Sequence, residues 1–315
     1  MLGVVIPVYN RKDRLEKLLQ NLEGQIYKRF IVVVVDDGST EDIKSVCDKS
    51  PLKIFYVKQP YNQGPGAARQ RGLEVCHKCN FELITFIDSD DLYAPHALER
   101  LTYEINHNNS DMVASGITWE KKNGVYSQVM PPGNTTWLAG KIFRLKSLYD
   151  NDISFDTTLR TNEDLAFNLK VRYSDLKLQY IEEILYIACD DRRSITRNKK
   201  QDSINCNGID YIRAIYSAYK WLKERNKTIE YNIYNIMQCY VYYEVWTERC
   251  GPAPDDIENC LHEMISDEEF AKILKSCYYW YRIKVNSFFV LDKQVYFFKE
   301  TLYEFLKRYG YEREV

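Results

Sequence analysis

The sequence predicts an α/β fold, in which a doubly wound, mostly parallel sheet is followed by an all-helical C-terminal module. Two observations predict the sheet: short apolar runs alternate with amphipathic helical stretches over about the first 200 residues, and acidic residues follow directly after two of those runs. Acids placed in this way are typical of the carboxyl ends of parallel strands, which meet at one edge of a sheet. A third observation predicts the helical module, because apolar residues beyond about residue 205 recur at helical spacing.

The length and charge of the chain limit the kinds of protein it can be. Its 315 residues suit one large domain with an appendage, or two domains. The formal net charge of −2 gives no general attraction to nucleic acid or to anionic lipid, so any phosphate chemistry must come from local sites. We therefore expect no nucleic-acid partner.

Cysteine usage and hydropathy indicate a cytoplasmic protein. The nine cysteines are scattered along a chain that shows no signal peptide, which fits reduced thiols better than a disulfide framework. Only Cys76-His77-Lys78-Cys79 has the spacing of zinc ligands, and it has no second matching pair. No apolar run approaches the ~20 residues of a membrane span, so we expect at most a peripheral contact with the inner face of the membrane.

Strands and helices alternate through the first part of the chain. Leu2 opens a buried strand whose ladder stops at Pro7, where a polar loop begins. Three further runs have the β-branched and aromatic composition of buried strands, and the stretches between them have helical periodicity. The expected strands are 2–10, 30–35, 53–57 and 83–87, and the expected helices are 13–21, 42–47, one entered from the glycine-rich loop 64–66, and 95–106.

A more varied pattern follows from residue 111. Residues 118–129 alternate like a hairpin that turns at Lys122-Asn123-Gly124. Asn162-Glu163-Asp164 opens an amphipathic helix with two acids in its first turn. Further strands are expected at 111–116, 179–181 and 184–188, and an arginine-rich loop at 189–197.

The last third of the chain, residues 205–315, is expected to be a separate helical module. Its aromatic residues fall on helical stripes, which indicates core or interface positions rather than a sugar-binding platform. A module with this much aromatic surface must bury it against the first domain or against another copy of itself. We therefore expect a homo-oligomer formed through this module.

The run 83–87 ends in Asp88-Ser89-Asp90-Asp91. At the carboxyl edge of an open parallel sheet, the alternate residues Asp88 and Asp90 would lie on one face and offer two hard oxygen donors to Mg²⁺ or Mn²⁺. A metal there could hold a diphosphate. These residues alone leave open the alternative that the segment only begins a turn and caps the helix that follows.

Other polar residues are expected at the same edge of the sheet. Asp37 follows the second strand and can accept the imide N–H of a uracil base, while Tyr9 can lie against that base. Gly64-Pro65-Gly66 leads into a helix that carries Arg69, so backbone N–H groups and a guanidinium could meet a phosphate. Together these pieces predict a pocket for a nucleotide diphosphate. Further candidate cations are Lys141, Arg144, Arg192 and Arg193.

Five motifs, in this order and at this spacing, resemble those of family 2 glycosyltransferases, which have the GT-A fold. They are Val5-Ile6-Pro7-Val8-Tyr9-Asn10, Val34-Val35-Asp36-Asp37-Gly38-Ser39-Thr40, Asn62-Gln63-Gly64-Pro65-Gly66-Ala67-Ala68-Arg69, Ile87-Asp88-Ser89-Asp90-Asp91 and Asn162-Glu163-Asp164. The resemblance covers about residues 1–200. It implies an inverting, metal-dependent hexosyltransferase that moves a sugar from a UDP-sugar donor to a glycan or other hydroxyl acceptor, in the synthesis of a cell-surface polysaccharide, teichoic acid or other glycoconjugate.

The resemblance also implies roles for single residues. Asp90 would ligate Mn²⁺ or Mg²⁺, Asp88 would reach the ribose or the same metal, and Asp164 would be the catalytic base. Arg69 would support the nucleotide. The residues that the resemblance places at the nucleotide-sugar site are Pro7, Tyr9, Asn10, Asp37, Arg69, Asp88, Ser89, Arg192 and Arg193, with uridine bound by Pro7, Tyr9 and Asp37.

The resemblance and the change in composition near residue 205 together divide the chain into a GT-A domain, residues 1–204, and the helical module. Residues 1–110 would form a Rossmann-like nucleotide-sugar half, and residues 111–204 the acceptor half. Two other functions stay open. The first is a nucleotidyltransferase, which would usually place a glycine-rich phosphate loop after the first strand, where this chain has Pro7-Val8-Tyr9-Asn10. The second is a non-catalytic nucleotide-sugar-binding scaffold. Such a scaffold would tolerate the loss of Glu163 and Asp164, yet this chain has both residues.

Overall fold

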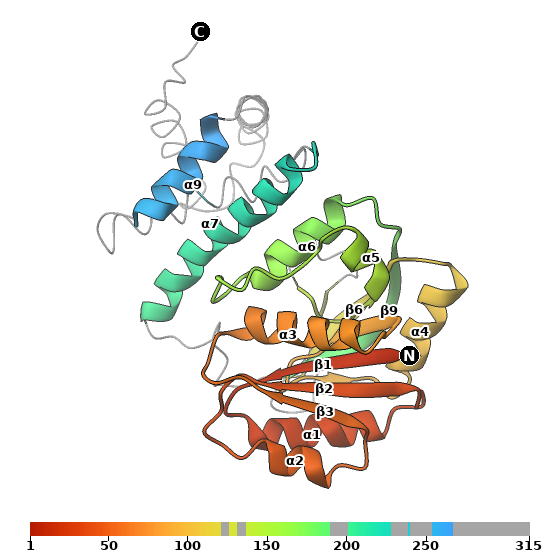
Figure 1. Cartoon of the computed structure of the whole chain (residues 1–315). Coiled ribbons are helices and arrows are strands. Elements are labelled where there is room, and N and C mark those ends of the chain that lie inside the picture. The colour runs from red at the N-terminus through yellow and green to blue at the C-terminus, as the bar shows by residue number, and fades with distance from the viewer. Residues whose placement is uncertain (121–125, 131–136, 190–200, 228–238, 240–253, 267–315) are drawn as a thin grey trace. The chain divides into compact units, whose positions relative to one another are not determined.

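The computed structural model describes residues 1–120, 126–130, 137–189, 201–227, 239 and 254–266. The chain forms two compact units, Met1–Asn198 and Lys199–Val315, and Figure 1 shows the layers of sheet and helices in the first. The described helices of the second unit are α7 (Gln201–Lys223) and α9 (Asp255–Ser266). Much of the expected helical module lies outside the described residues, so its all-helical character stays a prediction. Among the helices of the described part, none is long and apolar enough to cross a membrane.

Four parallel strands form the first half of the sheet. β1 (Leu2–Val8) pairs with β2 (Phe30–Asp36) on one side and with β4 (Leu83–Phe86) on the other, and β3 (Ile54–Lys58) pairs with β2. Every residue of β1, β2 and β4 is buried, which explains why these strands read as continuous apolar runs. Because β2 and β4 lie on opposite sides of β1, the carboxyl ends of β1 and β4 mark the place where open α/β sheets bind ligands.

Pro7 lies where the pairing between β1 and β4 has ended. Ile87 donates its N–H to the carbonyl of Val5 at 3.1 Å, while β1 stays paired with β2 as far as Val8. Proline has no N–H to donate, so it fits a strand position that requires no donor on one side. The segment after Ile87 therefore leaves the sheet at the point where its acidic residues begin.

The second half of the sheet is mixed. β8 (Lys141–Arg144) runs antiparallel between β4 and β6 (Met112–Glu120), β9 (Leu178–Cys189) runs parallel to β6, and the short β5 (Leu92–Tyr93) runs antiparallel to β9. β7 (Tyr126–Met130) pairs antiparallel with β6, as in the predicted hairpin, whose turn lies outside the described residues. The predicted α/β class is confirmed, and β8 is the antiparallel strand that joins the two halves.

β9 is one continuous strand where two short strands were expected. Its register against β6 steps from the pair Ala114–Tyr180 to the pair Gly116–Ile184, so β9 carries extra residues at this point. A β-bulge keeps the two strands paired while it interrupts the alternation of side chains. The alternation of side chains is interrupted at the bulge although the strand continues, which explains why the sequence predicted two strands.

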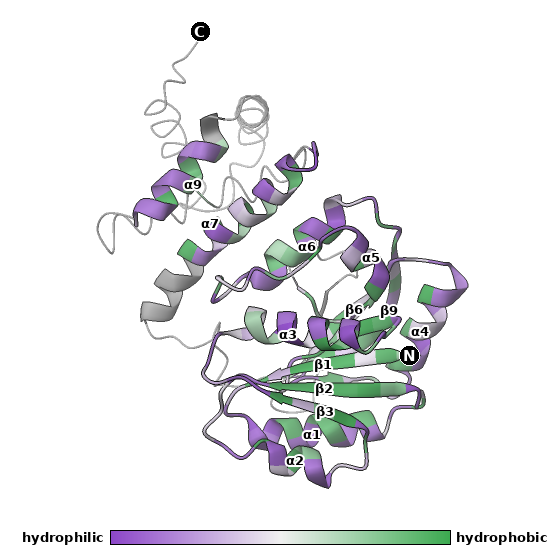
Figure 2. Ribbon diagram, viewed as in Figure 1, coloured by the Kyte–Doolittle hydropathy of each residue, from purple (hydrophilic) through white to green (hydrophobic). Residues whose placement is uncertain are grey.

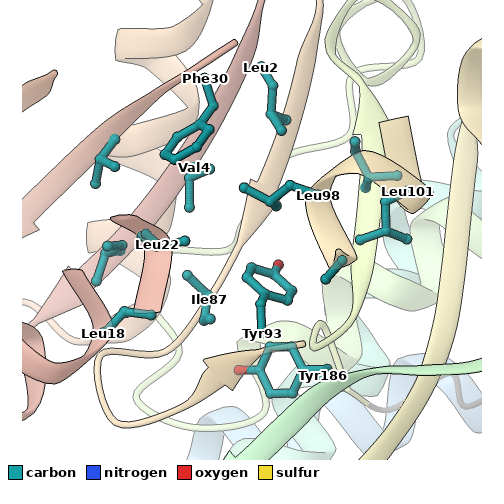
Figure 3. Close-up of a cluster of buried hydrophobic side chains, with 14 of the residues drawn as sticks. Leu2, Val4, Leu18, Leu22, Phe30, Ile87, Tyr93, Leu98, Leu101 and Tyr186 are labelled. Atoms are coloured by element: carbon teal, nitrogen blue, oxygen red, sulfur yellow. The ribbon is translucent and has the colours of Figure 1, made fainter. Parts of the chain in front are cut away.

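Helices cover both faces of the parallel strands. α1 (Lys12–Glu23), α2 (Lys44–Lys49) and α4 (Ala97–His107) bury apolar side chains in one core, and α3 (Pro65–Lys78) packs on β1 from the other side. Figure 2 shows hydrophobic strands between helices that alternate hydrophobic and hydrophilic residues. Figure 3 shows the first core, which includes Leu2, Val4, Leu18, Leu22, Phe30, Ile87, Tyr93, Leu98, Leu101 and Tyr186.

α3 approaches β1 closely because Gly72 has no side chain. A Cβ atom at Gly72 would lie 2.3 Å from Cγ1 of Val5. Alanine normally stabilises a helix over glycine by about 1 kcal/mol, but overpacking a core costs about 1–3 kcal/mol. We expect Gly72→Ala to lower the free energy of unfolding in urea by about 1–2 kcal/mol, and Gly72→Ala with Val5→Ala to cost less than the sum of the single changes. A more stable Gly72→Ala protein would contradict this account of the packing.

Candidate active site

The acidic segment after β4 forms a turn. β4 ends at Phe86, and Asp91 donates its N–H to the carbonyl of Asp88 at 3.0 Å. Asp88 and Asp90 were expected to be alternate residues of a strand, but the strand ends before Asp88, and the chain turns between Asp88 and Asp91. The side chain of Asp88 is 48% exposed and that of Asp90 is 12% exposed, while Ser89 is buried. The turn presents two carboxylates at the carboxyl edge of the parallel strands.

Asp90 contacts a cation from the loop after β1. Its Oδ2 forms an ion pair with Nη1 of Arg11, the residue that precedes α1. Burial raises the pKa of Asp90, and the nearby charge of Asp88 raises it further, while Arg11 acts in the opposite direction. Burial and the nearby carboxylate of Asp88 therefore both oppose the ionised form of Asp90.

Asp91 has a structural role that the sequence did not reveal. Its buried carboxylate accepts hydrogen bonds from the Tyr186 hydroxyl at 2.6 Å and from the Cys189 N–H at 2.8 Å, both on β9. Burial raises the pKa of Asp91 well above its ordinary value, and Asp88 and Asp90 add to this effect. The third acid of the run therefore fastens the turn to β9 instead of facing a ligand.

Arg69 joins the acidic turn to α6 (Glu163–Tyr173). Its Nη2 lies 2.5 Å from Oδ1 of Asp88, and its Nη1 pairs with Oε1 of Glu163. The side chain is only 8% exposed, and its buried Nε has no hydrogen-bond partner in the described part of the chain. Burial alone would lower the pKa of Arg69, but the charges of Asp88 and Glu163 raise it above its ordinary value. Its predicted contact with the nucleotide stays a prediction.

Asp164 lies in the first turn of α6, which begins after Asn162 in the left-handed region (φ 61°). Glu163 is buried against Arg69, whereas Asp164 is half-buried and its Oδ1 accepts the N–H of Leu165 at 2.8 Å. Consecutive helical residues point about 100° apart, so the two acids cannot face the same ligand. Burial raises the pKa of both carboxyls, and the charge of Arg69 opposes that shift.

Aromatic packing fixes α6 against the sheet. Phe167 stacks on Phe155 with ring centroids 4.2 Å apart, and it meets Phe86 of β4 edge-on at 6.2 Å. Phe143 of β8 packs edge-on against Phe167 at 5.7 Å. Phe86 lies two residues before Asp88, and Phe167 lies three residues after Asp164. Their contact therefore joins the strand that precedes the acidic turn to the helix that carries Asp164.

Asp37 is engaged by the segment that leads into α3. Its Oδ1 accepts the side-chain amide of Gln59 at 2.7 Å and the N–H of Gln63 at 2.8 Å, and its Oδ2 accepts the N–H of Gly64 at 2.8 Å. Burial raises the pKa of Asp37, and these hydrogen bonds act against the shift. A carboxylate has about four acceptor positions, so one is left for a base. The uracil contact stays a prediction beside this loop-holding role.

Three further residues of the predicted donor site, Pro7, Tyr9 and Asn10, lie around the end of β1. Tyr9 is 44% exposed, and Pro7 is buried within the strand. Asn10 accepts the N–H of Thr40 at 2.9 Å, which ties the loop after β1 to the loop after β2. The predicted residues Arg192 and Arg193 lie outside the described residues.

The two other candidate cations make contacts within the fold. Arg144 donates to the carbonyls of Ser110 at 3.3 Å and Ile105 at 3.1 Å, and so fastens the end of α4 to β8. Lys141 is buried, and burial lowers its pKa to about 7, while the charge of Asp164 opposes that shift.

The chemistry of the acidic turn fits a divalent cation. Within the described ranges, no group of three or more His, Cys, Asp or Glu side chains is arranged to hold a metal ion. Mg²⁺ in nucleotide sites is usually held by only one or two carboxylates, with phosphate oxygens and water as its other ligands. Asp88 and Asp90 supply that number of hard oxygen donors, and a cation beside them would favour the ionised form of Asp90, against the burial and the charge of Asp88 that raise its pKa.

Comparisons with known proteins identify the family of the chain. Residues 3–159 match the family model described as Glycosyl transferase family 2. A protein of Campylobacter jejuni named GalNAc(5)-diNAcBac-PP-undecaprenol beta-1,3-glucosyltransferase is 34% identical over 237 residues, which cover 69% of this chain and 71% of that protein. TarS of Staphylococcus aureus, a poly(ribitol-phosphate) beta-N-acetylglucosaminyltransferase, is 28% identical over 200 residues, which cover 58% of this chain and 34% of TarS.

A solved structure has a similar fold. The crystal structure of the 1–349 portion of S. aureus TarS in complex with UDP-GlcNAc has a TM-score of 0.57 and 20% identity, and the match covers 84% of each chain. This likeness concerns the fold alone. The family model and the 34% identity to the C. jejuni protein, over more than two thirds of its length, confirm the resemblance that the motifs indicated. The similar fold agrees with them. This chain belongs to glycosyl transferase family 2 and is a glycosyltransferase.

Proposed function

We propose that the protein is a metal-dependent, inverting glycosyltransferase that moves a sugar from a UDP-sugar donor to a hydroxyl group of a glycan. The observation that carries this proposal is the link through Arg69, whose guanidinium contacts Asp88 in the acidic turn and Glu163 beside Asp164. Residues suited to a metal-bound diphosphate and a residue suited to remove a proton therefore belong to one cluster. Membership of the glycosyltransferase family argues against nucleotidyl transfer and a purely binding role.

On the donor side, Tyr9 and Asp37 would contact the uracil base, and Asp88 and Asp90 would hold Mn²⁺ or Mg²⁺. The metal, when bound, neutralises the negative charge that develops on the diphosphate as UDP departs. The S. aureus TarS fragment was crystallised with UDP-GlcNAc, which supports a UDP-sugar as donor.

On the acceptor side, Asp164 is the proposed general base. A sugar hydroxyl is a weak nucleophile at neutral pH, so a carboxylate must take its proton while the oxygen bonds to the anomeric carbon. The electron pair of the broken bond leaves with UDP. Glu163 is occupied by Arg69, so it is poorly placed as the second nucleophile that a retaining double displacement would need. We therefore propose a single displacement that inverts the configuration at the anomeric carbon.

The names of the relatives support a cell-surface acceptor. The C. jejuni relative is named for an undecaprenol-linked oligosaccharide and TarS for poly(ribitol-phosphate). We infer that this protein also extends a glycan of a cell-surface polymer or glycoconjugate, from the cytoplasm and with at most a peripheral membrane contact. Assembly through residues 205–315 is part of the same proposal.

Turnover should require both a UDP-sugar and a divalent cation. Incubation with single UDP-hexoses and UDP-N-acetylhexosamines plus Mn²⁺ is expected to give slow release of UDP and free sugar, even without acceptor. EDTA should abolish this release and added Mn²⁺ or Mg²⁺ should restore it, because two carboxylates alone leave the diphosphate charge uncompensated. Release of pyrophosphate would indicate nucleotidyl transfer instead, and full activity in EDTA would remove the metal from the proposal.

A further inference from the structure

Lys141 is a buried cation that the proposed mechanism leaves without a role. The residue is 4% exposed, and its Nζ donates hydrogen bonds to the carbonyl of Trp137 and, at 2.9 Å, to Oδ1 of Asn168. Both of these acceptors are neutral. An ammonium group loses much of its hydration when it is buried, and neutral oxygens repay only part of that cost. Burial of the Lys141 ammonium group therefore carries a cost in free energy.

The backbone at Lys141 is fixed by neighbouring strands. Thr85 of β4 donates its hydroxyl to the carbonyl of Lys141 at 2.7 Å, and Ala114 of β6 is the register partner of Lys141. Gly140, just before β8, has φ +69°, and a Cβ there would lie 2.7 Å from Oγ of Ser115. Glycine is the residue that accepts both the backbone angle and the close approach. The ammonium group is thus carried by a rigid part of the sheet.

Asn168 and Asp164 lie one helical turn apart on α6. Residues at i and i+4 share one face of a helix, so the lysine that contacts Asn168 contacts the face that carries Asp164. Burial raises the pKa of Asp164, and the charge of Lys141 acts against that shift. Geometry and charge therefore connect β8 to the proposed base.

Charged groups reach Asp164 from four elements. Arg69 of α3 lowers its pKa, Asp88 of the acidic turn raises it, and Lys141 of β8 lowers it. Glu163 precedes Asp164 on α6, and the two acids each disfavour ionisation of the other. The guanidinium of Arg69 is paired with Asp88 and Glu163, so Asp164 shares its charge with two other acids. A further positive charge on this side of α6 would favour the ionised form of Asp164.

We propose that Lys141 is a positioning residue for sugar transfer: it holds the face of α6 that carries Asp164 and keeps a positive charge beside the base. This inference rests on the proposed role of Asp164. The base must be an ionised carboxylate before it can accept the proton of the acceptor hydroxyl, and a neighbouring cation favours that form.

The pH dependence of kcat tests this role. Lys141→Met removes the charge and keeps an unbranched side chain of nearly the same length, and Lys141→Arg keeps the charge. With saturating UDP-sugar and Mn²⁺, we expect the acid limb of the Lys141→Met profile to move about one unit toward higher pH, with kcat about tenfold lower on that limb. Because burial lowers the pKa of Lys141 to about 7, its charge is present below that pH, so the two profiles should converge above it. Lys141→Arg should restore most of the acid limb.

Lys170→Met is the matched control. Lys170 is another buried lysine, 6% exposed, whose Nζ donates to the carbonyl of Ser154 at 3.1 Å, and it lies on α6 as Asp164 does. It is six positions from Asp164 and so points about 240° away around the helix. Its replacement should leave the position of the acid limb unchanged.

An acid limb that stays at the parental pH in Lys141→Met, with normal calorimetric UDP binding and normal melting, would overturn the inference but not the base assignment. Parental activity in Asp164→Asn would overturn both. If Lys141→Met does not fold, Asn168→Ala should shift the acid limb in the same direction by less, and an unshifted limb in that variant would count against the inference. The pKa of Asp164, followed by NMR of labelled carboxyl carbons, should rise in Lys141→Met without any need for turnover.

Discussion

Replacing Asp164 by Asn is expected to preserve UDP-sugar binding and to slow sugar transfer by roughly 10²–10⁴-fold. Asparagine keeps the size of aspartate and can still accept the N–H of Leu165, which Oδ1 of Asp164 accepts at 2.8 Å. It cannot take a proton from an acceptor hydroxyl. Binding measured by calorimetry and transfer measured by product formation should therefore separate cleanly in this variant.

A surface acid provides the comparison for this change. Asp150, at the end of α5 (Leu145–Asp150), is 54% exposed and pairs with Lys146 at 2.5 Å. Asp150→Asn should transfer sugar at the parental rate. Near-parental transfer by Asp164→Asn, or a product whose anomeric configuration is retained by NMR, would show that Asp164 is not the base of an inverting displacement.

Asp90→Asn is expected to weaken Mn²⁺-dependent UDP-sugar binding by more than about tenfold. The change removes one of two carboxylates offered to a cation whose diphosphate partner is itself anionic. It also removes the ion pair with Arg11, so affinity must be measured both with Mn²⁺ and in EDTA. The loss should appear only in the presence of the metal.

Asp91→Asn separates metal binding from local folding. Asp91 is buried and accepts hydrogen bonds from Tyr186 and Cys189. Its replacement should therefore act mainly on stability: the melting temperature should fall, and the Mn²⁺-dependent affinity should change little. Equal calorimetric affinities for parental protein and Asp90→Asn in Mn²⁺ would remove Asp90 from the metal site.

Local patterns in the sequence were sufficient to predict the parallel strands and the edge at which the acids gather. β1 and β2 are buried along their whole length, so they read as unbroken apolar runs. The carboxyl ends of such strands lie at one edge, which placed Asp88 beside the end of β1 without any knowledge of tertiary contacts. The short β8 gave no comparable signal, because four residues do not reveal the direction of a strand.

Contacts between distant residues could not be predicted in the same way. Arg69 and Glu163 are 94 positions apart, and no periodicity connects them. Lys141 looks like a surface charge in the sequence, and it is buried because β8 lies between β4 and β6. Asp91 could not be told from Asp88 and Asp90, since their difference arises only from where β9 passes.

If Asp88 and Asp164 act as proposed, the shared guanidinium of Arg69 would make donor binding and acceptor binding thermodynamically dependent on each other. Any ligand that draws Asp88 away from Arg69 leaves that cation to Glu163 and Asp164, and so changes the affinity of whatever binds at the start of α6. Linkage is reciprocal, so an acceptor bound there must change the affinity for the donor by the same factor. Cooperative, ordered occupancy of the two substrates would then need no moving domain, because a single side chain between them carries the coupling.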